Sequence, residues 1–228
     1  MPAVIDIGAV GSASANSGAT TTSIARRCNA PNNLLIALEW NYTTGQQIPS
    51  SMTFNSVGLT RFYSIPDAGT FSASIWTMPN PPIGGPFTLA CNYSSPVSGA
   101  ALALVFASGV DLSSAPLKAP NETFGSGNNN ATLSAPLGRA SDLFIMICGN
   151  GCTSQSSGIN YGQVNLSQQT GINGGYCASC DMGPANGNTF SWSNSGSSTA
   201  LEWLGIGAVI VGLPLPLPSY AIDEQTEF

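Results

Sequence analysis

Residues 87–94 read FTLACNYS, so apolar side chains alternate with polar or small ones. That period of two is typical of a β-strand with one buried face and one solvent-facing side. Phe190 and Trp192 alternate with polar neighbours in the same way. No stretch of the chain combines a helical period with helix caps. The alternation therefore predicts an all-β fold.

Other segments are apolar almost throughout and are bounded by turn residues, which indicates central strands covered on both faces. Glycine, proline and asparagine turns separate these segments, as expected for an antiparallel β-sandwich or jelly roll. One of the segments has alanines and leucines that would also suit a helix. That segment is Ala100–Ala107. The other three apolar segments are Leu34–Trp40, Leu143–Cys148 and Leu204–Leu213. Residues 153–188 are polar and glycine-rich, and we expect long loops or a flap there.

The C-terminal residues differ from the rest. Residues 213–218 alternate leucine with proline, which excludes a central strand and favours an extended, polyproline-like conformation. We expect one domain over residues 1–213 and an extended proline-rich arm over 214–228. The arm is expected to dock on a neighbouring subunit or on the domain's own flank, with a solvated tail as the alternative. The apolar side chains expected to bind a partner are Leu215, Leu217, Tyr220, Ile222 and Phe228.

Charge is scarce in this chain. Only 7% of the residues are charged, whereas about a quarter is usual, and histidine is absent. The commonest general acid–base group is therefore missing, and we expect no enzymatic activity and no catalytic residues. A net charge of −6 argues against a nucleic-acid partner, because phosphate binding depends on lysine and arginine. Residues 1–6 lack the pattern of a secretory signal, and the apolar segments are too short to span a membrane.

Several segments, taken in order along nearly the whole chain, carry a resemblance to a known group. They are Asn33–Trp40, Met52–Thr60, Ile75–Pro82, Phe106–Asp111, Ala115–Leu117, Ser141–Ile145 and Trp203–Leu213. Together they resemble a jelly-roll domain, a concanavalin-like β-sandwich, that recurs in bacteriophage structural proteins and bacterial surface proteins. The resemblance implies a fold and a role in attachment to a larger assembly or recognition of a surface. It carries no shared catalytic motif, and the six cysteines and the proline-rich arm depart from it.

The cysteines form the most motif-like pattern in the chain. Cys148 and Cys152 are followed by Cys177 and Cys180, which gives two short pairs separated by a gap. Two such pairs suit a structural zinc site with four thiolate ligands. Disulfides and buried thiols are the competing interpretations, and the sequence leaves all three open. We therefore expect no cofactor other than a structural zinc ion at these cysteines, since no stretch of the chain has the spacing of a known calcium-binding loop.

Glycoside hydrolysis needs two carboxylates at a fixed separation, and two carboxylates of this chain occupy similar Leu-Glu-Trp settings on expected strands. They are Glu39 and Glu202. The favoured interpretation is that both point to solvent or pair with an arginine, with no catalytic role.

These observations favour a non-enzymatic virion structural protein on the particle surface. We expect a decoration or cement subunit of a phage capsid, or else a tail or fibre component. The expected partners are the major capsid protein or other virion subunits, and further copies of the chain in a homo-oligomer, taken as a trimer. The alternative is a carbohydrate-binding or adhesin domain, in which the sugar would stack on Trp76, Tyr161 and Tyr176.

Overall fold

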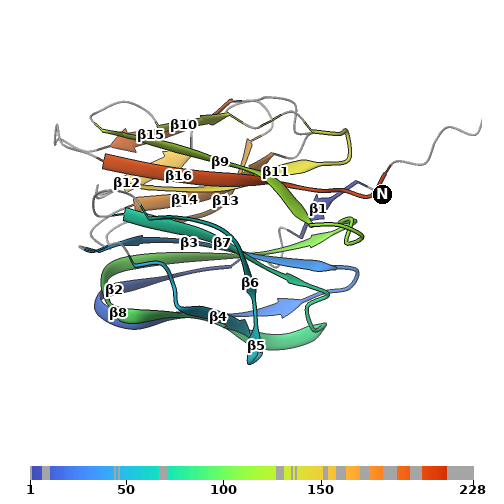
Figure 1. Cartoon of the computed structure of the whole chain (residues 1–228), viewed down its shortest axis with the longest axis horizontal. Coiled ribbons are helices and arrows are strands. Elements are labelled where there is room, and N and C mark those ends of the chain that lie inside the picture. The colour runs from blue at the N-terminus through green and yellow to red at the C-terminus, as the bar shows by residue number, and fades with distance from the viewer. Residues whose placement is uncertain are drawn as a thin grey trace, which may run out of the picture.

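A computed structural model shows stacked antiparallel β-sheets (Figure 1). The structure describes residues 2–6, 11–43, 45, 47–66, 71–126, 131–134, 136, 138–150, 154–157, 163–169, 175–181, 189–195 and 202–214. Within these ranges every regular element is a strand. The same part of the chain accordingly holds no helix with the length and apolar character to cross a membrane.

Eight strands form the large sheet. Six of them lie in the order β5-β4-β8-β3-β7-β6, and β1 and β2 both pair with β8. The bounds are Val4–Ile5 (β1), Gly11–Cys28 (β2), Leu34–Tyr42 (β3), Ser51–Phe54 (β4), Val57–Gly58 (β5), Thr60–Pro66 (β6), Phe71–Pro79 (β7) and Gly84–Ser108 (β8). The segment whose composition also suited a helix, Ala100–Ala107, therefore lies within β8 as a strand.

Two smaller sheets lie on one side of the large sheet. The five-stranded sheet has the order β13-β14-β11-β16-β9, and the three-stranded sheet has the order β10-β15-β12. The bounds are Leu117–Ser126 (β9), Ala131–Ser134 (β10), Leu143–Asn150 (β11), Ser154–Ser157 (β12), Gln163–Gln169 (β13), Gly175–Asp181 (β14), Thr189–Ser195 (β15) and Glu202–Ile210 (β16).

β8 belongs to two layers of the stack. Residues 84–92 pair with β4 and with the second half of β2, whereas residues 99–107 pair with β3 and with the first half of β2. Leu89 from the first half and Leu104 from the second half belong to one buried cluster. The large sheet thus folds back over itself, and Figure 1 shows β2 and β8 curving together.

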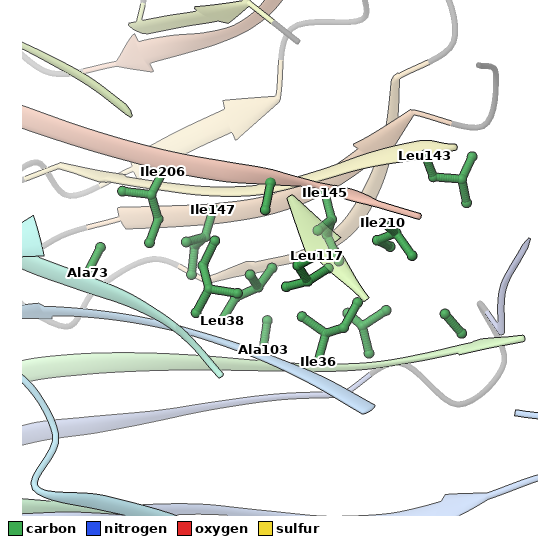
Figure 2. Close-up of a cluster of buried hydrophobic side chains, with 14 of the residues drawn as sticks. Ile36, Leu38, Ala73, Ala103, Leu117, Leu143, Ile145, Ile147, Ile206 and Ile210 are labelled. Atoms are coloured by element: carbon green, nitrogen blue, oxygen red, sulfur yellow. The ribbon is translucent and has the colours of Figure 1, made fainter. Parts of the chain in front are cut away.

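The main core lies between the large sheet and the five-stranded sheet. Ile36 and Leu38 of β3 meet Ile145 and Ile147 of β11 and Ile206 of β16 (Figure 2). All five side chains are completely buried. Each buried aliphatic side chain of this kind contributes roughly 1.5–3 kcal/mol, so this interface is the main source of stability.

Two further clusters cover the outward faces of these sheets. Leu35 and Ala37 of β3 point away from the main core, into the space enclosed by the folded large sheet. Phe144 and Met146 of β11 pack with Leu133 of β10, between the five-stranded and three-stranded sheets. The central strands are therefore buried on both faces, as the apolar runs predicted.

The structure confirms an all-β fold of antiparallel sheets packed face to face, as in a β-sandwich. The jelly-roll connectivity implied by the resemblance stays a prediction. The expectation of loops or a flap over residues 153–188 is wrong in part, because three strands form there. β12 pairs with β15, β14 pairs with β11, and β13 pairs with β14. The arm from Leu215 onward lies outside the described residues, so its conformation stays a prediction.

We predict that Gly149→Ala destabilises the fold by about 1–3 kcal/mol, the usual cost of overpacking a core. Gly149 of β11 lies directly against the indole ring of Trp40, and a Cβ atom there would overlap the ring. Gly58→Ala is the matched control, because a Cβ atom at Gly58 meets nothing within 4 Å. Urea unfolding measures both variants, and equal stabilities would contradict the close fit of Trp40 against β11.

Candidate functional site

A buried carboxylate lies inside the fold of the large sheet. Glu39 of β3 is completely buried, as are its apolar neighbours in the sequence, Leu38 and Trp40. Its carboxylate accepts hydrogen bonds from Asn41 Nδ2 at 2.6 Å, from Ser74 Oγ at 2.7 Å and from the Tyr93 hydroxyl at 2.9 Å. These donors come from β3, β7 and β8, so the carboxylate links three strands and both layers of the large sheet.

The strand register explains how these groups meet. Glu39 of β3 lies directly opposite Ser74 of β7, and Ala37 lies opposite Trp76. Trp76 Nε1 donates to Ser74 Oγ at 2.9 Å, so the indole orients the hydroxyl that donates to Glu39. The Arg61 guanidinium lies over the Trp76 ring, 5.7 Å from its centre.

Burial controls the ionisation of this cluster. It raises the pKa of Glu39 from 4.5 to about 7, against the effect of the hydrogen bonds from Asn41, Ser74 and Tyr93, which favour the charged form. Burial also raises the pKa values of Tyr93 and Cys91 well above their ordinary values, and the Glu39 carboxylate adds to both shifts. Near neutral pH, Glu39 is therefore the member of the cluster that exchanges a proton.

The pairing of Glu39 with Glu202 as a catalytic couple is not supported. Glu39 points into the folded large sheet, away from the five-stranded sheet in which Glu202 begins β16. The expectation that Glu39 faces solvent or an arginine is also wrong, because its three partners are uncharged. β3 is covered on both faces, so either orientation of residue 39 is buried. A substrate could reach this carboxylate only if the layers separated.

We predict that Glu39→Gln changes how stability depends on pH. Because folding raises the pKa of Glu39, the wild type loses stability as the pH rises from 4.5 through 7. Over that interval the variant, which cannot ionise, should gain about 3 kcal/mol relative to the wild type. Chemical denaturation at a series of pH values measures the difference. Parallel curves for the two proteins would show that Glu39 does not titrate in this range.

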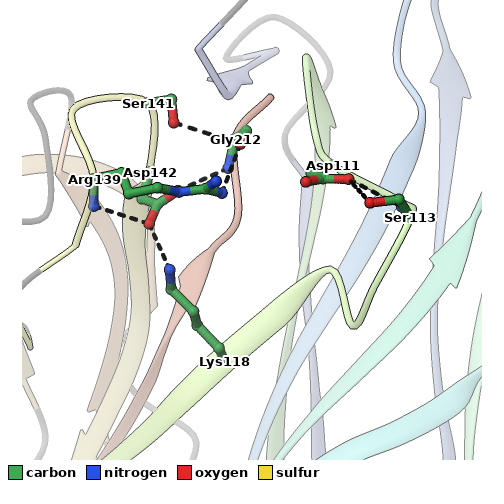
Figure 3. Close-up of polar contacts among 7 residues, drawn as sticks. All are labelled: Asp111, Ser113, Lys118, Arg139, Ser141, Asp142 and Gly212. Carbon is green, nitrogen blue, oxygen red and sulfur yellow. Dashed lines mark hydrogen bonds and ion pairs between the residues drawn. The ribbon is translucent and has the colours of Figure 1, made fainter. Parts of the chain in front are cut away.

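A second buried carboxylate holds the end of β16. Asp142 accepts from Lys118 Nζ at 2.7 Å, from the backbone N–H of Arg139 at 3.0 Å and from the backbone N–H of Gly212 at 3.0 Å (Figure 3). The Arg139 guanidinium pairs with the same carboxylate at 3.3 Å and donates to the carbonyl of Gly212 at 2.9 Å. We call Lys118, Arg139, Ser141, Asp142 and Gly212 the C-terminal clasp.

Backbone hydrogen bonds complete the clasp on the residues that follow β16. Val211 N–H donates to the Pro116 carbonyl, and Leu213 N–H donates to the Gly109 carbonyl. Gly212 fits because a Cβ atom there would overlap the Ser141 carbonyl. Residues 211–213 are therefore fixed to three separate segments of the domain, immediately before the proline-rich sequence that begins at Pro214.

The pKa of Asp142 is shifted in the opposite direction to that of Glu39, because Asp142 pairs with cationic side chains. Burial opposes its ionisation, but Lys118 and the backbone N–H groups of Arg139 and Gly212 outweigh this effect and lower the pKa of Asp142. The two cationic side chains remain partly exposed, at 41% for Lys118 and 46% for Arg139. Asp142 is thus ionised at neutral pH, and it holds Gly212 both directly, through the backbone N–H, and by positioning the Arg139 guanidinium on the Gly212 carbonyl.

We predict that Asp142→Asn lowers the free energy of unfolding at pH 7 by about 1–3 kcal/mol, the usual cost of losing hydrogen bonds to a charged group. Because the pKa of Asp142 is lowered in the fold, this loss should shrink as the pH falls through that pKa. Asp111→Asn is the control, since Asp111 is a nearby half-buried residue whose carboxylate accepts from the backbone N–H and the hydroxyl of Ser113 and, among the described residues, makes no hydrogen bond to Gly212 or Lys118 (Figure 3). Equal effects of the two substitutions would contradict the clasp.

The structure places part of the predicted cysteine site. Cys148 of β11 is buried, and the strand register sets it directly opposite Cys177 of β14. Cys180 lies three residues further along β14, opposite Ile145, and Cys152 lies outside the described residues. Three residues of a strand span about 10 Å, so the backbone brings Cys148 and Cys177 together and sets Cys180 apart from them. The zinc site and the disulfides both stay predictions.

Of the residues predicted to bind sugars or partners, only Trp76 has a described side chain. Trp76 is only 6% exposed and packs in the folded large sheet, which does not suit a platform for stacking a sugar. Tyr161 lies outside the described residues, and only the backbone of Tyr176 is described, in β14. The expected partner-binding residues Leu215, Leu217, Tyr220, Ile222 and Phe228 also lie outside them.

Comparison with known proteins gives no relative for this chain. No family model matches the sequence, no curated protein matches it, and no solved structure matches its fold.

Proposed function

We propose that this protein is a non-enzymatic structural subunit of a virion that stabilises a larger assembly through contacts between subunits. The proposal covers a capsid decoration or cement protein and a tail or fibre component. Its supports are the resemblance carried by the strand segments, the charge-poor sequence and the rigid stack of sheets. A surface with few charged groups loses less hydration energy than a charge-rich one when it packs against a neighbour, which suits a subunit of an assembly.

The observation that carries the proposal is the C-terminal clasp. A flexible segment that binds a neighbour loses conformational freedom, and a fixed origin reduces that cost. Asp142 and the backbone ties on Val211 and Leu213 supply such an origin directly before the arm. We infer that the arm contacts a neighbouring subunit through Leu215, Leu217, Tyr220, Ile222 and Phe228, and that the clasp transmits the resulting force to the core.

The partners follow from this proposal. The arm would bind the major capsid protein, another virion subunit or a second copy of the chain. A closed symmetric oligomer is the usual arrangement for identical subunits, and we propose a trimer on the particle surface. The direct check is the composition of purified virions, in which the protein should occur in a fixed ratio to the major capsid protein.

We predict that deleting residues 215–228 weakens assembly at least tenfold but leaves the melting temperature nearly unchanged, because the deletion begins beyond the clasp. The matched control keeps the length of the arm and replaces its five apolar contact residues by serine. It should lose assembly to a similar extent. Sedimentation velocity and co-sedimentation with virions measure both variants, and full assembly without the arm would refute its role.

A further inference from the structure

A hollow lies on the outer surface of the folded large sheet, where the β4–β5 turn meets the start of β8. Its volume is about 340 Å³. Figure 1 shows β4 and β5 in the outermost layer, on the opposite side of the stack from β16. We call it the β4–β8 groove, and its lining residues are Thr53, Asn55, Ser56, Pro86, Phe87, Thr88 and Ala90.

The groove is held in shape by a tight hairpin. Asn55 and Ser56 connect the paired residues Phe54 and Val57, and both have positive φ angles, 50° and 66°. A two-residue turn with this backbone matches the natural twist of the strands it joins. The Asn55 N–H donates to the Thr88 carbonyl at 3.0 Å, which fixes the turn to β8.

The side chains of the groove are also preset. Thr53 lies opposite Ala90 in the register, on the face that points away from the buried cluster. The ring of Phe87 meets Phe54 edge to face, with centres 5.7 Å apart, so a buried residue orients the ring. A ligand would therefore enter a groove whose shape exists before it binds, which reduces the entropy lost on binding.

The chemistry of the lining is polar but uncharged. Thr53, Asn55, Ser56 and Thr88 offer hydroxyl and amide groups, while Pro86, Ala90 and the half-buried Phe87, whose ring also packs on the buried cluster, add an apolar surface. A charged ligand would lose hydration here without meeting an opposite charge in the lining itself. A neutral sugar matches both parts, because its hydroxyls pair with the polar groups and its C–H face lies on the apolar ones.

An extended peptide fits this position less well. Peptides that add to a sheet bind its free backbone groups at an open edge. β4 already pairs with β5 on one side and with β8 on the other, so recognition in the groove must come from side chains. The volume is near the lower limit for small-ligand sites, which suits a short stretch of glycan.

We propose that the β4–β8 groove binds a neutral glycan. This inference goes beyond the assembly role, because the groove and the C-terminal clasp lie on different layers of the stack. A subunit held in a particle through its arm would present the groove to a glycan-bearing surface.

The test uses the full chain on an array of neutral and acidic oligosaccharides, followed by calorimetric titration with the neutral glycan that binds best. Thr88→Val and Ser56→Gly each remove a lining hydroxyl, and glycine is well suited to the positive φ of residue 56. Each variant should weaken binding about tenfold. Thr60→Val, at an exposed threonine of β6 outside the groove, is the matched control and should bind as the wild type does.

The outcomes separate this proposal from the assembly role. The protein lacking residues 215–228 should bind the glycan normally, so a failure of the arm hypothesis leaves the groove proposal intact. Binding of no neutral glycan by the folded wild type, or of acidic glycans only, would overturn the proposal. Unchanged affinity in both hydroxyl variants would overturn it too, as would capture of a peptide that the Thr88→Val variant loses.

Discussion

The covering of β3 on both faces is the constraint on which the rest of the structure depends. Alternate residues of this one strand belong to two different cores, one shared with the five-stranded sheet and one enclosed by the folded large sheet. Every residue of β3 except the last, Tyr42, is accordingly buried. The bend of β8 follows from the same need, because its first half must return to cover the face of β3 that the five-stranded sheet leaves open.

Two carboxylates are buried in this stack of sheets, and each is stabilised in a different way. Glu39 has uncharged partners, so burial dominates and the proton is held more tightly. Asp142 has Lys118 and Arg139 beside it, so it stays charged despite burial. The first arrangement joins the two layers of the large sheet and the second fixes the end of β16. Both carboxylates therefore act on the relative position of strands, and neither lies in an open site.

Much of the fold could be predicted from the period of two and from the apolar runs, since strand pairing and burial leave a local pattern. Glu39 was misjudged although a signal existed, because Leu34–Trp40 was expected to be covered on both faces and residue 39 lies inside it. The strand β13 also had a signal in the alternation of Val164 and Leu166 with polar neighbours. The clasp had none, since Lys118, Asp142 and Gly212 meet only through tertiary structure.

The structure shows where the few charged side chains form ion pairs. Among the described residues, both ion pairs end on Asp142, which also accepts from the Gly212 N–H. Ion pairs thus fix the backbone at the end of β16, whereas the lining of the β4–β8 groove contains no charged residue. Contacts made by such a surface depend on shape and on hydrogen bonds, which salt screens little. The described part of the structure thus gathers its ion pairs at Asp142 and offers neutral hydroxyl and amide groups in the β4–β8 groove.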